Sequence, residues 1–266
     1  MHAWTWQTWQ DRAFLTCDLL APWPHGFFSR HFAPARPEQL VPALAPQAAV
    51  FRTKQVHGNG VLAAAVIANQ AATAASEPAS AAPPPADGCY SVAPQQAMWV
   101  CTADCTPALV GDVRTGQVAA VHAGWRGTAQ RILPMAVAKL QAQGSVLADL
   151  RVALGPAIDG QVYQVGTEVA VETGKSISVP PPQFQPSAAL LTHLQSLTPP
   201  AVLPDEAPDR VRLDVRQINR LQMLDLGLTD RQIAIAPHCT YQEPETFFSY
   251  RRTGERQVQW SGIVSR

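Results

Sequence analysis

The stretch MWVCTADCTPALVGDVRTGQVAAVHAGWRG, residues 98–127, decides the fold class. Three apolar runs in it, Met98–Cys101, Ala108–Val110 and Val118–Val121, are separated by turn residues, and this pattern predicts three short strands. The segment Arg114–Gln117 is short enough to join the last two strands as an antiparallel hairpin. A hairpin is incompatible with a purely parallel sheet, so we expect a mixed sheet.

Helical patterns follow on the C-terminal side of this stretch. Apolar residues of Ile132–Leu140 fall on one helical face, and Pro134 fits such a helix only in its first turn, so the helix is expected to begin after Thr128. A second helix is indicated between Asp214 as N-cap and Gly227 as its stop. The segment 232–236 then predicts another strand. The expected class is therefore α/β, a mixed sheet flanked by helices.

The length and composition fit one globular domain over residues 1–266. Of the 266 residues, 47% are hydrophobic, which is enough for a substantial core. Two Ala- and Pro-rich segments, 62–86 and 180–208, are expected to be variable loops, the second with a short helix near residues 188–197.

The charges and cysteines narrow the class of partner. Twenty basic and twenty acidic residues cancel, and no run of Lys or Arg suggests contact with nucleic acid or anionic lipid. No apolar segment approaches the roughly 18 residues of a membrane span, and Met1–Gln10 lacks the features of a signal peptide. The five cysteines are odd in number and scattered, which favours reduced thiols. We expect a cytoplasmic protein that acts on a small molecule.

Three reactive side chains stand beside turn residues in separate segments. His57 and His122 are each followed within two residues by Gly, and Cys105 lies in the turn after a predicted strand. Strand ends hold side chains rigidly, and an adjacent Gly leaves them uncovered. Imidazole and thiolate are good ligands for zinc, and three scattered ligands leave the fourth position open for water or substrate. A zinc ion in such a site lowers the pKa of a bound water to roughly 7.

Six ordered motifs resemble those of the laccase-domain family, whose members are also called purine nucleoside phosphorylase-like proteins, polyphenol oxidases or peptidoglycan editing factors. The motifs are TKQVHGNGV, CTADCTPALVGD, VHAGWRGT, LGPAI, VYQVGTEV and FFSYRR. The resemblance implies an α/β sandwich with a metal site of His57, Cys105 and His122. It also implies phosphorolysis of adenosine, inosine or methylthioadenosine by inorganic phosphate, with deamination of adenosine as an additional activity.

Further residues are candidates for the site. Arg126 is suited to binding phosphate or a substrate oxygen, although a surface ion pair is equally compatible with its position. Asp104 is expected to act as an acid or base or to orient a ligand, with a turn cap as the alternative. Asp87 fits an Asx-turn and also resembles the family's ADG element.

Aromatic residues beside arginines form a further candidate group. The motifs HGFFSR (residues 25–30) and FFSYRR (residues 247–252) each contain a pair of phenylalanines that could form a wall for a planar base, and the neighbouring guanidinium could meet phosphate. Core packing with an edge salt bridge is the alternative. The arginines are Arg30, Arg251 and Arg252.

Other functions remain open at the sequence level. Cys105 activated by His122 would make a thiol hydrolase that edits peptidoglycan precursors, but this hypothesis does not use His57. Copper-dependent oxidation of phenols ranks last, because multicopper oxidases bind their several copper ions with more His ligands than the seven His residues of this chain. Copper does bind such donors more tightly than zinc. A zinc-stabilised binding module would need a fourth protein ligand, and no motif supplies one.

Overall fold

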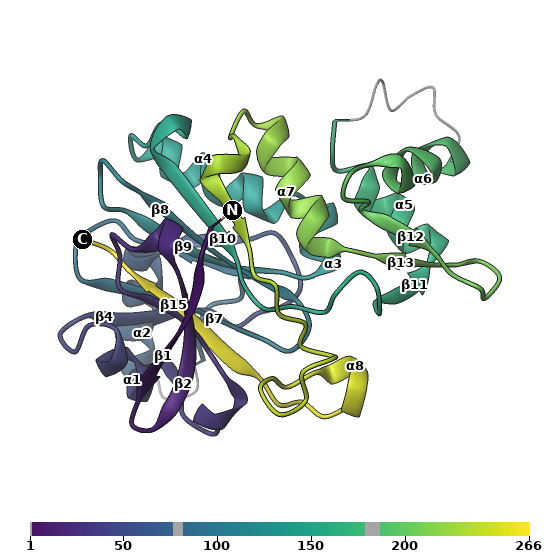
Figure 1. Cartoon of the computed structure of the whole chain (residues 1–266). Coiled ribbons are helices and arrows are strands. Elements are labelled where there is room, and N and C mark those ends of the chain that lie inside the picture. Colours follow the sequence, from purple (N-terminus) through teal and green to yellow (C-terminus); the bar gives the residue numbers. More distant parts are fainter. Residues whose placement is uncertain (1, 77–81, 179–186) are drawn as a thin grey trace.

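Two six-stranded sheets pack face to face, and a three-stranded sheet lies beside them (Figure 1). The computed structural model describes residues 2–76, 82–178 and 187–266. The first sheet contains, in spatial order, β1 (Trp4–Trp9), β2 (Arg12–Cys17), β3 (His25–Phe28), β15 (Gln259–Val264), β7 (Gln96–Thr102) and β4 (Ala49–Arg52). The second contains β14 (Ile233–Ile235), β10 (Leu150–Leu154), β8 (Thr106–Asp112), β9 (Val118–Ala123), β6 (Gly88–Tyr90) and β5 (Val61–Ala63).

The sheets are mixed, as the sequence predicts. β8 and β9 form the expected antiparallel hairpin, whereas β4–β7, β5–β6 and β10–β14 are parallel pairs. The three predicted strands of residues 98–127 are present as β7, β8 and β9. The α/β class with a sandwich of sheets is therefore confirmed.

The central strands of the second sheet are buried on both faces. Along β8, Leu109 packs into the apolar layer between the two sheets, while Ala108 and Val110 pack under the helices. β9 alternates in the same way, with Ala120 facing the first sheet and Val121 facing the helices. This double burial explains why both strands are continuous apolar runs rather than alternating ones.

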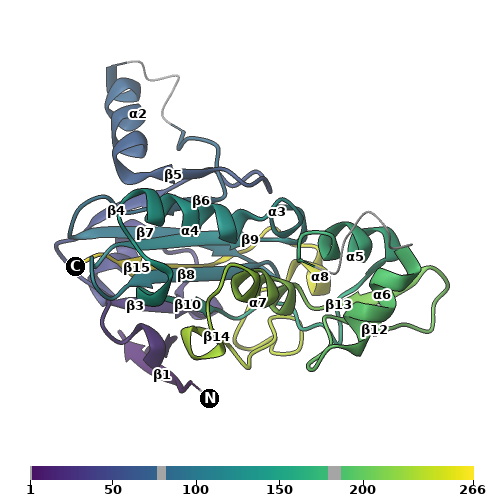
Figure 2. The same ribbon diagram turned by 90° about the horizontal axis from the view of Figure 1, so that it is seen from above.

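Helices α4 (Ile132–Ala142) and α7 (Val215–Asp225) cover the outer face of the second sheet (Figure 2). Both were predicted. Pro134 lies in the first turn of α4, and the Asp214 carboxylate caps α7 by accepting a hydrogen bond from the Gln217 N–H. A short helix not predicted from the sequence, α3 (Trp125–Ala129), precedes α4 and is separated from it by Arg131 in a left-handed conformation.

The expectation that residues 62–86 form a loop is wrong for most of its length. Residues 61–63 form β5, and α2 (Ala64–Ser76) follows and projects from the sandwich (Figure 2). Alanine has the highest intrinsic helix propensity, so this segment needs no amphipathic period to form a helix. In the second Ala/Pro-rich segment, the predicted short helix is confirmed as α6 (Ser187–Ser196), whereas residues 180–186 lie outside the described residues.

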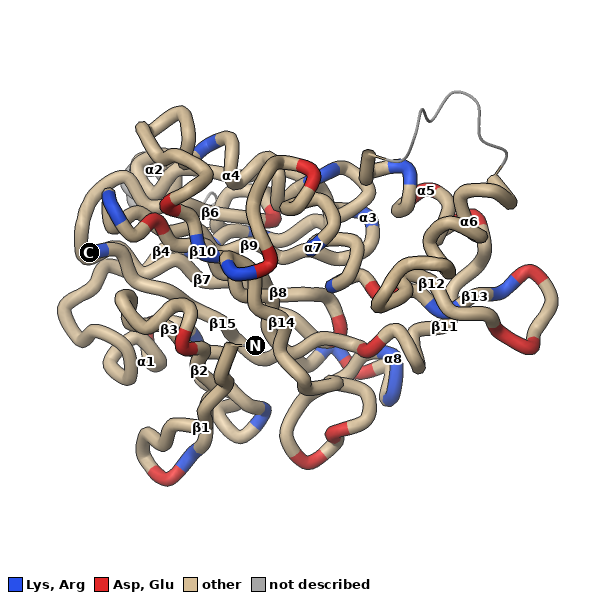
Figure 3. The backbone as a smooth tube through the Cα atoms, turned by 45° about the horizontal axis from the view of Figure 1, so that its top comes forward, with Lys and Arg blue, Asp and Glu red and all other residues tan. Residues whose placement is uncertain are grey.

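The third sheet has its own apolar cluster. It consists of β11 (Gln164–Gly166), β13 (Arg210–Leu213) and β12 (Val202–Pro204), and α5 (Thr167–Gly174) and α6 pack against it. Two short helices, α1 (Pro37–Leu40) and α8 (Tyr250–Thr253), complete the described helices. None of the described helices is long and apolar enough to cross a membrane. Charges of both signs are scattered along the backbone (Figure 3).

Candidate metal centre

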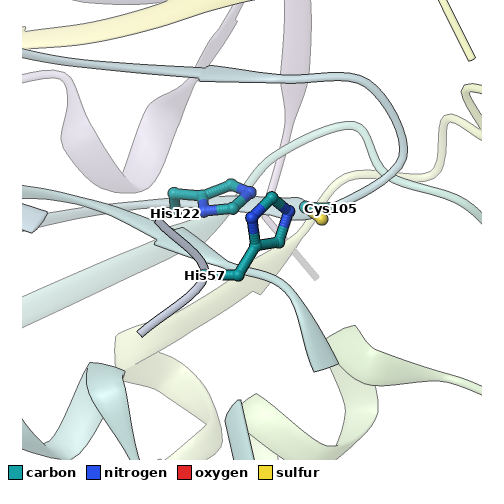
Figure 4. Close-up of side chains that lie close together, drawn as sticks. All are labelled: His57, Cys105 and His122. Atoms are coloured by element: carbon teal, nitrogen blue, oxygen red, sulfur yellow. The ribbon is translucent and has the colours of Figure 1, made fainter. Parts of the chain in front are cut away.

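Three chain segments bring His57, Cys105 and His122 together. His57 lies in the connection between β4 and β5, Cys105 in the tight turn between β7 and β8, and His122 near the end of β9. Pro107 on β8 is paired with His122 on β9, and this register carries the Cys105 turn to the end of β9. The two rings and the thiol converge on one point (Figure 4).

The geometry of the three donors suits a small metal ion. One donor atom from each residue lies within 4.8 Å of the others, and the two imidazole rings meet edge to face with centroids 4.9 Å apart. Zinc lies about 2.0–2.3 Å from nitrogen and sulfur ligands, so atoms this close can bind the same ion after small adjustments. His57 is exposed and His122 is 4% exposed, so the centre opens on the His57 side.

A buried carboxylate organises two of these residues, and the sequence indicated it only weakly. One oxygen of Asp87 accepts hydrogen bonds from the His57 backbone N–H and from His122 Nδ1, both at 2.8 Å. The other oxygen accepts from the N–H groups of Val56 and Gly58 at 3.1 and 2.8 Å. Because Nδ1–H of His122 is donated to Asp87, Nε2 is the nitrogen of this ring that can bind a metal, and it does so by releasing its proton.

Asp87 also accounts for an unusual backbone conformation at His57. The His57 φ angle is +61°, in the left-handed region that residues other than glycine rarely adopt. Three consecutive N–H groups around it point to the Asp87 carboxylate, and this set of hydrogen bonds stabilises the turn. The Asx-turn interpretation of Asp87 therefore understates its role.

The electrostatics of the cluster favour a thiolate. Burial alone would raise the pKa of the Cys105 thiol, but the neighbouring rings of His122 and His57 lower it to about 6. Burial opposes protonation of His122, yet the charge of Cys105 and the hydrogen bond to Asp87 raise its pKa to about 9. Thiolate is the form of cysteine that binds metals and attacks electrophiles.

Close backbone packing fixes the distance between α3 and the cluster. A Cβ atom on Gly124 would lie 2.9 Å from the Cys105 sulfur and 3.6 Å from Cδ2 of His57. Only a residue without a side chain fits there, which explains the Gly that follows the His122 strand.

The two other predicted site residues, Asp104 and Arg126, lie in different settings on segments that adjoin the cluster. The oxygens of Asp104, next to Cys105, accept hydrogen bonds from Thr240 Oγ1 and from the Arg251 N–H, both at 2.7 Å. Asp104 thus ties the C-terminal segment to the Cys105 turn. Arg126, in the first turn of α3, is exposed and lies over the Trp125 ring at 4.4 Å from its centroid.

The three candidate arginines of the aromatic motifs differ in their roles. Arg252 donates to the carbonyls of Thr240, Tyr241 and Phe247, which identifies it as a structural residue. Arg30 lies over the Phe248 ring and donates to the Pro244 carbonyl. Arg251 alone contacts the Asp104 segment, and its guanidinium lies 4.7 Å from the centroid of the Tyr163 ring.

Comparison with known proteins places the chain among enzymes named for purine chemistry. A family model described as multi-copper polyphenol oxidoreductase laccase matches residues 36–265. A protein of Synechocystis sp. named purine nucleoside phosphorylase is 53% identical over 98% of this chain and 97% of its own. An adenosine deaminase from an unknown prokaryotic organism is 33% identical over 58% of this chain and 52% of its own. The crystal structure of YlmD from Geobacillus stearothermophilus superposes with a TM-score of 0.77, at 26% identity and 98% coverage of both chains.

Proposed function

Since the chain belongs to the multi-copper polyphenol oxidoreductase laccase family, we propose that it is a zinc-dependent purine nucleoside phosphorylase that also deaminates adenosine. Adenosine, inosine and methylthioadenosine are the proposed nucleosides, and inorganic phosphate is the second substrate. The observation that carries the metal dependence is the convergence of His57, Cys105 and His122 within 4.8 Å. The name of the relative that is 53% identical supports the reaction class.

The residues of the centre suit both proposed reactions. In phosphorolysis, the bond between the purine and ribose C1′ breaks, a phosphate oxygen bonds to C1′, and the base leaves with a proton. In deamination, water replaces the amino group of adenosine, and inosine and ammonia are released. Zinc held by His57, Cys105 and His122 would supply Lewis-acid catalysis and would lower the pKa of a bound water.

Two side chains of the protein are assigned to phosphate binding and to proton transfer. We assign Arg126 to the binding of phosphate, because it lies four residues after His122 in α3, is exposed, and has no acidic partner among the described residues. Asp104 is proposed to transfer a proton to or from the substrate. Thr240 and Arg251 hold the Asp104 carboxylate by hydrogen bonds, and its remaining lone pairs are available for the proton.

Two alternative functions predict different metal requirements. A hydrolase with Cys105 as nucleophile and His122 as base would act without metal, and the pKa of about 6 for Cys105 favours the thiolate that it needs. A phenol oxidase would need copper at the same donors. A cytoplasmic location is part of the proposal, but neither mechanism depends on it.

The first experiment is metal analysis of protein purified without added metal. The protein is then incubated with adenosine and phosphate, and adenine, inosine and ribose 1-phosphate are quantified. Near-stoichiometric zinc and metal-dependent products are expected. His57→Ala should lose metal and turnover, whereas the matched variant His193→Ala, on α6, should keep both. Full activity of metal-free protein would overturn the zinc mechanism and direct attention to Cys105 and cell-wall precursors.

A further inference from the structure

Two arginine–aromatic pairs stand on segments that adjoin the metal centre, α3 after His122 and the Arg251 segment that is hydrogen-bonded to Asp104. The guanidinium carbon of Arg126 is 4.4 Å from the Trp125 ring centroid, and that of Arg251 is 4.7 Å from the Tyr163 ring centroid. Both rings pack against the apolar cluster of the third sheet. Both members of the first pair lie on α3, which follows His122; in the second pair Arg251 lies on α8, whose arginines are blue in Figure 3, and Tyr163 directly precedes β11.

Arg251 is held in place from two sides. Its backbone N–H donates to Asp104, and its Nη1 donates to the Gln164 carbonyl at 2.7 Å. Asp104 precedes Cys105, so these bonds fix the Arg251 segment relative to the metal centre. Stacking on Tyr163 then restrains the plane of the guanidinium, which reduces the entropy lost when it binds a ligand.

Neither guanidinium is neutralised by a carboxylate. Among residues 2–76, 82–178 and 187–266, no ion pair involves the Arg126 or Arg251 side chain. The Arg126 side chain has no hydrogen-bonded partner among these described residues. The Arg251 guanidinium uses only Nη1, which donates to the Gln164 carbonyl. Two exposed cations therefore retain free N–H donors.

Tyr163 contacts Arg251 and packs against the same apolar cluster of the third sheet as Trp125, the ring under Arg126. Burial and the charge of Cys105 raise the pKa of Tyr163 to about 12, while the positive charges of Arg251 and Arg126 oppose this rise. The geometric link is local: Gln164, the residue after Tyr163, accepts the hydrogen bond from Arg251 Nη1, so the ring and the guanidinium are held together at the start of β11.

We propose that Arg251 and Arg126 together form the phosphate subsite, with Tyr163 as the positioning residue for Arg251. This inference rests on the proposed phosphorolysis. A guanidinium matches a phosphate in bidentate geometry, and two of them neutralise its two charges. A lysine lacks the planar group that stacks on Tyr163, so Arg251→Lys is expected to raise the KM for phosphate although it keeps the positive charge.

The kinetic test compares KM values for phosphate and for nucleoside. Arg251→Gln and Arg126→Gln should each raise the KM for phosphate about tenfold or more, because charge-assisted hydrogen bonds are lost, and should change the KM for inosine by less than about twofold. Arg114→Gln is the matched control, since Arg114 follows the opposite end of β8. Phosphorolysis with an unchanged KM for phosphate in both variants would overturn the subsite.

Substitutions of Tyr163 separate positioning from packing. Tyr163→Phe keeps the ring, so its KM for phosphate should equal that of the unmodified protein. Tyr163→Leu keeps apolar volume without a flat ring, and it should reproduce the effect of Arg251→Gln. Equal behaviour of the Phe and Leu variants would contradict the positioning role.

Direct binding distinguishes this inference from the proposed function. Inorganic phosphate and adenosine 5′-monophosphate are titrated separately into the metal-loaded protein by calorimetry, without a nucleoside present. If inorganic phosphate binds and its binding weakens in Arg251→Gln, the subsite is supported. If the unmodified protein at the same time shows no phosphorolysis, the proposed reaction is refuted while the subsite stands. Absence of phosphate binding, or an effect on the nucleotide alone, would overturn the subsite.

Discussion

The Asp87 carboxylate accepts a hydrogen bond from Nδ1 of His122 at 2.8 Å, and both side chains are almost completely buried. The same oxygen accepts the His57 N–H, so one carboxylate fixes the ring of one candidate ligand and the backbone of another. His122 N–H also donates to the Asp87 carbonyl at 2.7 Å. The candidate metal centre is thereby organised without an ion.

Replacing Asp87 by Asn should weaken metal binding without removing a ligand. An amide offers one acceptor oxygen, so its NH₂ group would face two of the four donors that Asp87 now satisfies. We expect zinc affinity to fall about 10- to 100-fold and the free energy of unfolding to fall by about 2–4 kcal/mol. Chelator competition and denaturant titration measure these two quantities.

Asp112→Asn provides the control for this variant. Asp112 is also fully buried and accepts the N–H groups of Arg114 and Thr115, but it lies at the far end of β8. It should lose stability and keep its zinc affinity. Equal loss of zinc affinity in both variants would show that Asp87 acts only through general stability.

The sequence predicts the parts of this architecture that depend on local pattern. β8 and β9 are recognisable because burial on both faces makes each a continuous apolar run, and α7 because Asp214 and Gly227 mark its ends. The helix α2 is missed, since its alanines favour helix through propensity and show no amphipathic period. The three-residue group His57, Cys105 and His122 is indicated because each member adjoins a turn.

Roles that depend on long-range pairing are not visible in the sequence. Asp87 meets the His57 turn only because β5 pairs with β6 and β6 with β9. Arg251 meets Tyr163 across 88 positions of the chain, and nothing local in either motif indicates this contact. The ADG element marks Asp87 as a candidate, but its partners emerge only when the sheet is assembled.

Gly124→Ala should disturb the candidate metal centre through a steric clash with Cys105 alone. The Gly124 φ and ψ angles of −71° and 169° suit alanine, so the backbone is not strained, but the new Cβ would lie 2.9 Å from the Cys105 sulfur. We expect about a tenfold loss of zinc affinity, corresponding to about 1.4 kcal/mol of misfit. Gly60→Ala, whose Cβ meets Ala86 at an ordinary 3.6 Å, should bind zinc normally. Normal zinc affinity of Gly124→Ala would mean that the Cys105 turn can move freely.

His25 should make the protein less stable in mild acid. Its Nδ1–H donates to the Trp23 carbonyl and its Nε2 accepts the Cys17 N–H, both at 2.8 Å, so the buried ring is neutral. Burial lowers the pKa of His25 below its usual 6.5. The unfolded chain therefore binds the proton more readily than the folded protein. The stability that this neutral His25 contributes is fully present above pH 6.5 and is lost as the pH falls below this value. The free energy of unfolding should fall by at most about 1.4 kcal/mol per pH unit from this group.

The measurement is denaturant unfolding of metal-free protein at pH 7.5 and pH 5.5. His25→Gln should reduce the loss of unfolding free energy between these two pH values, while His193→Gln on α6 should leave it unchanged. Comparing the variants removes the contributions of the other titrating groups. An identical pH dependence with and without His25 would contradict this assignment.

Asp104→Asn tests whether Asp104 moves a proton or only holds the Cys105 turn. Its oxygens accept hydrogen bonds from Thr240 Oγ1 and the Arg251 N–H, so a purely structural role should be disturbed equally by Thr240→Val. Because general acid–base catalysis contributes roughly 100-fold or more, we expect Asp104→Asn to lower kcat by about that factor and to flatten one limb of the pH profile. Thr240→Val should lower kcat by less than about tenfold and keep the profile, since the carboxylate remains. Steady-state rates of phosphorolysis and deamination across the pH range supply the comparison. Equal losses with unchanged profiles would assign Asp104 to positioning, because an acid or base cannot be replaced by an amide without changing how the rate depends on pH.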